Sequence, residues 1–99
     1  MKIKMVMKWD GITPEMYEKI RKLTDWEGNK PKGAMFHAAS FAEGGLRVTD
    51  IWESADDFNS FASNRLMPVI AQVEGVTGEP QVEISQLHAI YVPSDVKLN

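Results

Sequence analysis

Hydrophobic and polar side chains alternate over the first residues of the chain. The apolar side of the alternation consists of Ile3, Met5, Met7 and Trp9, and the other side carries Lys2, Lys4, Val6 and Lys8. A period of two is typical of a β-strand with one buried face. The pattern therefore predicts a first strand over 2–9, which Asp10 and Gly11 end.

The pattern then changes to steps of three and four residues. Thr13 followed by Pro14 is typical of a helix start, because the hydroxyl caps a free N–H and proline needs no partner there. The apolar and aromatic residues at helical spacing are Met16, Tyr17, Ile20, Leu23 and Trp26. We expect an amphipathic helix with this stripe on the core, ended by 28–31.

Two strand-like runs, 34–42 and 46–53, flank Glu43, Gly44 and Gly45, which predicts a β-hairpin. If Ala42 lies opposite Leu46, the pleat places these residues on one face: Phe36, Ala38, Ser40, Val48, Asp50 and Trp52. The other face then carries His37, Ala39, Phe41, Arg47, Thr49 and Ile51. Both faces mix apolar and polar groups, so we expect both to be covered.

A second helix is predicted after the hairpin. Ser54 caps it, and Asp56 and Asp57 lie in its first turn, where the helix dipole favours negative charge. The expected buried stripe is Phe58, Phe61, Ala62 and Leu66. Pro68 predicts either a kink or a new short helix from Met67 to about Val73, because proline removes a helical hydrogen bond.

The segment 81–91 alternates again and predicts a fourth strand, followed by a tail, 93–99, that is expected to be loosely held unless it packs on a partner chain. The order β-α-β-β-α-β predicts an α+β, ferredoxin-like fold, with a four-stranded antiparallel sheet and two helices on one face. The bare face would expose Phe41 and Ile51, and a second copy of the chain would cover it, so we expect a homodimer.

The length of 99 residues indicates a single domain, 1–99, and a formal net charge of -3 without a basic cluster argues against nucleic-acid binding. The absence of cysteine is compatible with a reducing cytosol. No signal-like or membrane-spanning apolar run occurs in the sequence. We therefore expect a cytoplasmic protein that does not bind a membrane.

Few residues in the chain suit acid–base chemistry near neutral pH. His37 and His88 are the natural general-base candidates, but each could equally be a structural, hydrogen-bonded histidine. Asp50, within an apolar strand, must find a partner such as Arg47 or Ser40, as a buried anchor or as a catalytic carboxylate. Arg47 could also receive a ligand carboxylate or lie in solvent. No metal-ligand spacing is present, so no metal site is expected.

The run LRVTDIWESADDFNSF, together with FHAASF before it and LHAIY near the end, resembles the dimeric α/β barrel superfamily that includes the antibiotic biosynthesis monooxygenases. The resemblance implies a dimeric α/β barrel in which Trp52 faces a pocket, although a core aromatic at a strand end is the alternative for Trp52. Phe36, Arg47 and Phe61 are the other expected ligand-contacting residues. Haem-degrading members carry a histidine in the second helix, where this chain has Phe61, Ala62 and Ser63. No cofactor is therefore expected.

Two functions from different classes fit these expectations. One is an enzyme of the cofactor-free monooxygenase or isomerase kind, acting on a small apolar organic molecule with His37, Asp50 and His88 as catalytic residues. The other is a non-catalytic binding protein for a hydrophobic ligand, such as a fatty acid or an aromatic metabolite. Turnover needs a convergent acid or base, whereas binding needs only shape and an apolar wall.

Overall fold

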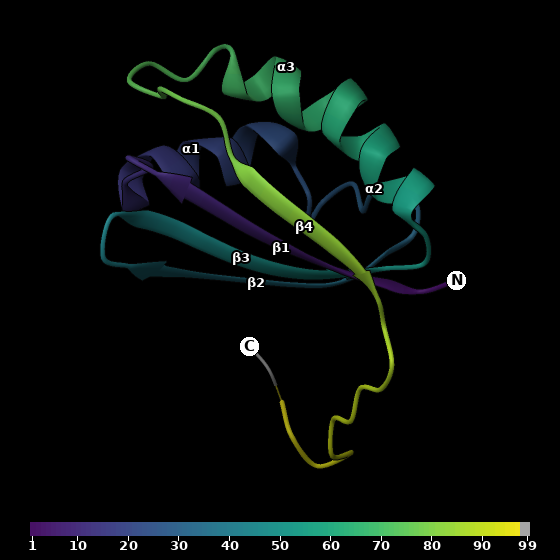
Figure 1. The fold of residues 1–99 in the computed structure, drawn as a ribbon. Helices are drawn as coiled ribbons and strands as arrows, with labels where there is room; N and C mark the ends of the chain where they lie inside the picture. The colour runs from purple at the N-terminus through teal and green to yellow at the C-terminus, as the bar shows by residue number, and fades with distance from the viewer. Residues whose placement is uncertain (98–99) are drawn as a thin grey trace.

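A computed structural model describes residues 1–97 and has the predicted order of elements (Figure 1). The elements are β1 (Ile3–Asp10), α1 (Pro14–Thr24), β2 (Ala34–Ala42), β3 (Gly45–Trp52), α2 (Ala55–Phe61), a π-helical segment (Ala62–Leu66), α3 (Met67–Ile70) and β4 (Gln81–Gln86). The strands form one sheet in the order β2-β3-β1-β4, with every neighbouring pair antiparallel. This is the ferredoxin-like fold, and the helices lie on one side of the sheet (Figure 1).

The core lies between the sheet and the helices. The alternation in β1 is confirmed, since Ile3, Met5, Met7 and Trp9 are all buried. The helices contribute further buried residues: Ile20, Phe58, Phe61 and Ile70. The second helix begins as predicted, because the Ser54 side chain accepts a hydrogen bond from the Asp57 N–H.

The hairpin has a different register from the predicted one. Ala42 pairs with Gly45 rather than with Leu46, so His37 lies opposite Asp50 and Phe36 lies opposite Ile51. Side chains that face each other across a ladder point to the same side of the sheet. The prediction for β2 is therefore wrong by one residue: His37, Ala39 and Phe41 share the helix-covered face with Val48, Asp50 and Trp52.

Gly45 explains this tight turn. Its φ is +150°, and a Cβ on it would meet the carbonyl oxygen of Trp9 at 2.5 Å, so a side chain there would clash with backbone. Gly44 also has positive φ, and its carbonyl accepts a hydrogen bond from the Gly11 N–H. The reversal is thus made by Glu43 and Gly44 alone, with Gly45 already in β3.

Helix α1 starts at the predicted cap and ends earlier than predicted. The Thr13 hydroxyl accepts a hydrogen bond from the Met16 N–H. The helix stops at Thr24 because Asp25 adopts the left-handed conformation, with φ of 51°. Trp26 consequently lies outside the helix, and Leu23, predicted to be buried, is 53% exposed.

Pro68 has the predicted effect on the second helical stretch. The Met67 N–H donates to the carbonyl of Ala62, five residues back, which is a π-helical bond. A new short α-helix, α3, then starts at Met67 with Pro68 in its first turn, where the missing N–H has no cost.

Strand β4 is shorter than predicted, ending at Gln86 rather than at 91. The segment that follows leaves the sheet on the side opposite to the helices (Figure 1) and exposes apolar side chains, including Ile90 and Tyr91. Within residues 1–97, no helix is long and apolar enough to cross a membrane.

Candidate active site

A cavity of about 760 Å³ lies between the helix-covered face of the sheet and the helices. Its apolar wall includes Met5, Met7, Ile20, Leu46, Val48, Phe58, Phe61 and Ile70. Three polar groups reach into this wall from different elements: Tyr17 of α1, His37 of β2 and Asp50 of β3. An apolar cavity with a few convergent polar groups is the usual form of a small-molecule site.

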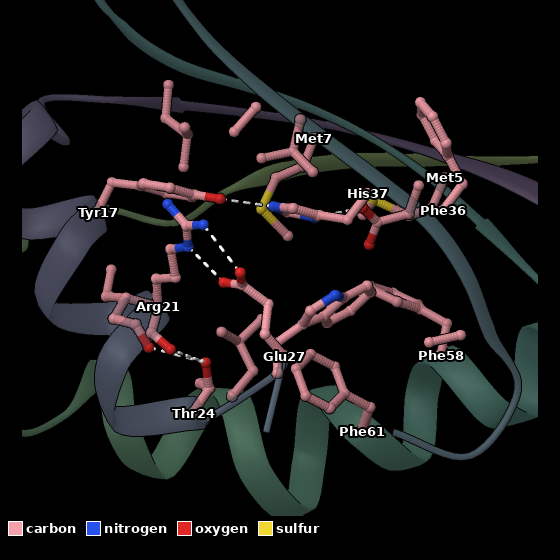
Figure 2. A pocket seen from close by; sticks show the side chains of 18 of the residues that line it. Met5, Met7, Tyr17, Arg21, Thr24, Glu27, Phe36, His37, Phe58 and Phe61 are labelled. Carbon is pink, nitrogen blue, oxygen red and sulfur yellow. Dashed lines mark hydrogen bonds and ion pairs between the residues drawn. The ribbon is translucent and has the colours of Figure 1, made fainter. Parts of the chain in front are cut away.

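The polar groups form one continuous chain of hydrogen bonds. The Tyr17 hydroxyl lies 2.7 Å from Nε2 of His37, and Nδ1 of His37 lies 2.6 Å from Oδ1 of Asp50 (Figure 2). The other oxygen of Asp50 accepts the indole N–H of Trp52 at 3.1 Å. Asp50 is 3% exposed, so these contacts supply the partners that a buried carboxylate requires.

The chain of bonds determines how His37 can act. The indole N–H of Trp52 can only donate, and an ionised Asp50 can only accept, so Nδ1 of His37 carries a proton that it donates to Asp50. In the neutral imidazole, Nε2 then holds a lone pair that accepts the Tyr17 hydroxyl. Asp50 thereby fixes the tautomer that leaves Nε2 as a base facing the cavity.

Burial raises the pKa of Tyr17 above its usual value, with the nearby carboxylates of Glu18, Asp50 and Glu27 adding to the effect and Arg21 opposing it. The phenol therefore stays protonated at neutral pH and acts as a hydrogen-bond donor toward Nε2 of His37.

Aromatic rings surround this base. Trp26 lies with its ring centroid 4.9 Å from that of His37, and it meets Phe61 and Trp52 edge-on at 5.7 and 5.5 Å. The Tyr17 ring is parallel to that of His37, with the centroids 6.1 Å apart, and it reaches the imidazole end-on through its hydroxyl. Trp26 packs against the imidazole and Tyr17 bonds to its Nε2, so both contacts limit the motion of His37.

Charged side chains lie at the edge of the cavity. Arg21 donates from Nε and Nη2 to the two carboxylate oxygens of Glu27, at 2.5 and 2.9 Å (Figure 2). Arg21 lies one helical turn after Tyr17 on α1, and Glu27 follows Trp26 in the segment after the helix. The hydrogen bond from Arg21 holds the pKa of Glu27 below its usual range.

Three of the residues predicted for the site line the cavity on its helix-covered side. His37 and Asp50 are brought into direct contact, and Phe61 forms part of the wall. Phe36 borders the cavity at the start of β2, but its pairing with Ile51 directs its side chain to the opposite face of the sheet.

The other predicted residues lie elsewhere. Trp52 is fully buried behind Asp50 and is not among the cavity-lining residues. Arg47 pairs with Asp10 and with backbone carbonyls, so the predicted Arg47–Asp50 contact is wrong. His88 lies exposed beyond the end of β4, outside the cavity of its own chain.

Sequence reasoning missed the roles of Tyr17, Trp26 and Arg21. The helical spacing places Tyr17 in a core stripe, but a tyrosine on a buried helix face also needs a partner for its hydroxyl, and here a histidine is that partner. The placement of Trp26 could not be predicted locally, because it depends on the early end of α1 at Asp25. Arg21 lies within α1, but its pairing with Glu27 depends on the same helix end.

Within residues 1–97, no group of three or more side chains has the arrangement of a metal site. No protein-family model matches the chain, and no curated protein matches it by sequence. Solved structures do match over nearly the whole chain. A monooxygenase of Streptomyces coelicolor, solved with nanaomycin D, has a TM-score of 0.60 at 16% identity and covers 94% of this chain and 92% of its own.

Two further matches extend the comparison. A candidate antibiotic biosynthesis monooxygenase of Chloroflexus aurantiacus has a TM-score of 0.67 at 10% identity, over 93% of this chain and 98% of its own. A protein of unknown function from Nitrosomonas europaea has a TM-score of 0.68 at 13% identity, over 94% and 95%. The chain thus shares the fold of proteins like the antibiotic biosynthesis monooxygenases. At these identities the likeness concerns the fold, and activity must be argued from the site.

Proposed function

We propose that this chain, folded like the antibiotic biosynthesis monooxygenases, is a cofactor-independent oxygenase-like enzyme that removes a proton from a small, largely apolar organic molecule. The observation that carries the proposal is the hydrogen-bonded series Tyr17–His37–Asp50–Trp52 at an apolar cavity. A positioned base in a largely apolar cavity suits the abstraction of a weakly acidic proton.

The chemistry follows from the position of the base. Nε2 of His37 takes a proton from an activated C–H of the bound molecule, leaving a carbanion that the aromatic wall shields from water. Molecular oxygen oxidises this carbanion to a hydroperoxide at the same carbon, using the proton that His37 returns. Loss of water from the hydroperoxide leaves a carbonyl, so a CH₂ group and O₂ become C=O and H₂O.

Tyr17 and Asp50 have separate roles in this scheme. Asp50 holds the tautomer of His37 and stabilises the imidazolium that forms when Nε2 is protonated. The Tyr17 hydroxyl occupies Nε2 in the free protein, and it is placed to donate instead to negative charge developing on a bound molecule.

The proposal is tested by oxygen consumption with quinol-like and enolisable substrates, with product identified by mass spectrometry. His37→Gln is expected to lower turnover by about 100-fold or more, the usual contribution of a general base. Ser40→Ala, on the opposite face of the same strand, is the matched control and should retain turnover. Unchanged turnover in His37→Gln would refute the assignment of the base.

A carrier of hydrophobic ligands is the second candidate, favoured by the size and the apolar wall of the cavity. The same substrates separate the two functions. Binding without oxygen uptake, and without isomerisation of the bound molecule, on every substrate in the panel would favour the carrier over the enzyme.

A further inference from the structure

The apolar cavity carries a charged group at its edge that the proposed chemistry does not use. Arg21 and Glu27 both line the cavity, and neither is buried. Their two parallel hydrogen bonds have the fork geometry in which a guanidinium binds any carboxylate. Figure 2 shows the Arg21 guanidinium close to the Tyr17 ring, with the Glu27 carboxylate reaching it from the other side.

The Glu27 carboxylate therefore occupies a position that a ligand carboxylate could take. An exposed ion pair contributes little to stability, so replacing one carboxylate with another at Arg21 has a small cost. Arg21 retains its contact with Glu18, at 3.4 Å, whichever carboxylate it holds. The partner that is exchanged is Glu27.

The position of Arg21 relative to the base sets the orientation of such a ligand. Tyr17 and Arg21 are one helical turn apart on α1, so their side chains lie on the same face of the helix. A molecule with its carboxylate on Arg21 and its apolar body against the wall would pass beside the Tyr17 hydroxyl and Nε2 of His37.

We infer that the cavity takes amphipathic acids, apolar ring systems carrying one carboxylate, and that Arg21 recognises this carboxylate in exchange for Glu27. This inference rests on the proposed binding of a small apolar molecule in the cavity, and it adds the class of that molecule. Glu27 acts as an internal competitor, because its carboxylate holds the place at Arg21 that the carboxylate of the bound acid would take.

The experiment compares naphthoate with naphthamide, which share a ring system and differ in charge, by calorimetric titration at neutral pH. In the wild-type protein naphthoate is expected to bind more tightly. Arg21→Gln should weaken naphthoate by roughly tenfold, the effect of removing a charge-assisted pair, and leave naphthamide unchanged. Glu27→Gln should tighten naphthoate by about two- to fivefold, because the competing carboxylate is gone.

Other outcomes overturn the inference in distinguishable ways. If both variants weaken both probes equally, the Arg21–Glu27 pair is a structural clasp and not a recognition site. If naphthamide binds as well as naphthoate and Arg21→Gln changes neither, the inference fails while the apolar site stands. If neither probe binds the wild-type protein, the proposed small-molecule site itself fails, and the inference fails with it.

Discussion

Asp50 is a buried carboxylate in an apolar surrounding, and its two oxygens have separate partners. Oδ1 accepts from His37 and Oδ2 accepts from Trp52, so each partner satisfies a different part of the charge. Loss of either donor would leave a buried acceptor unpaired, which costs about 1–3 kcal/mol. The hydrogen bonds from His37 and Trp52 therefore explain how the Asp50 carboxylate can be buried at the wall of the cavity.

Trp52→Phe tests the structural role of the indole. The variant removes the N–H that Asp50 accepts, so we expect a loss of about 1–3 kcal/mol in the free energy of unfolding. At roughly 4–8 °C per kcal/mol for a domain of this size, calorimetry should show a clear fall in melting temperature. Ligand affinity should change little, since Trp52 does not line the cavity. A large loss of affinity at unchanged stability would place the ring in the binding surface instead.

Trp26 is expected to be the tryptophan that reports ligand binding. Trp9 also lines the cavity, but Trp26 contacts the proposed base His37, whereas Trp52 lies behind Asp50. Trp26→Phe should remove most of the change in indole fluorescence on titration with naphthamide, and Trp52→Phe should preserve it. The reverse result would mean that the ligand does not pass beneath Trp26.

The raised pKa of Tyr17 makes a prediction in alkali. Because burial favours the neutral phenol, the folded protein holds this proton more tightly than the unfolded chain does. Stability from Tyr17 is then fully present below the unfolded pKa of about 10 and is lost as pH rises through the higher folded value. Ultraviolet titration should show a phenol that ionises late, and Tyr17→Phe should abolish that phase. Because the chain has two tyrosines, the Tyr17→Phe variant shows which of them gives the late ionisation.

At the scale of elements, the caps and the periodicities were readable and the hairpin register was not. The two helix caps, Thr13 and Ser54, and the alternation of buried residues in β1 depend only on residues close together in the chain. Local sequence is therefore enough to predict them. The register of β2 against β3 depends on whether the turn contains two residues or three. A difference of one residue moves every side chain of a strand to the other face, which is why His37 was not placed beside Asp50.

The end of α1 was missed for a related reason. An aspartate rather than a glycine takes the left-handed conformation there, and Arg65 of the π-helical segment donates to the Thr24 carbonyl at 2.6 Å. Such a cap comes from 41 residues away along the chain, so local sequence could not indicate it. It places Trp26 and Glu27 over the cavity, which is the part of the site that the sequence did not predict.

Ser54→Ala tests how firmly α2 is anchored. The hydroxyl caps the helix that carries Phe58 and Phe61 on the cavity wall. Loss of such a cap costs about 1 kcal/mol, so we expect a melting temperature lower by roughly 4–8 °C. Ser63→Ala, at an exposed position of the same helical stretch, is the control. Equal melting temperatures for the two variants would contradict the cap.

For the whole molecule, we propose a homodimer formed through the uncovered side of the sheet. The expectation that this side exposes Phe41 and Ile51 is wrong, because Phe41 lies on the helix-covered face and the Ile51 side chain is buried. The apolar surface here comes from the segment after β4, which extends beyond the sheet with exposed apolar side chains: Ile90, Tyr91, Val92 and Val96. Apolar side chains that stay in water do not stabilise a single chain, so we expect a second copy of the chain to cover them.

Sedimentation should therefore give twice the mass of the chain at micromolar concentration, with a melting temperature that rises with protein concentration. Ile90→Glu combined with Tyr91→Glu should shift the protein toward monomers, because these side chains are exposed in the single chain and are not needed for its core. A wild-type protein that sediments as a monomer would refute the dimer.

The central claim is that His37, held by Asp50 and Tyr17, removes a proton from a molecule in the cavity. A naphthol tests it directly, because its absorption spectrum distinguishes the phenol from the phenolate. At a pH below the pKa of the free naphthol, the wild-type protein is expected to bind it as the phenolate, and His37→Gln is expected to bind it as the neutral phenol. A bound naphthol that stays neutral in the wild-type protein, or that ionises equally in His37→Gln, would contradict the claim.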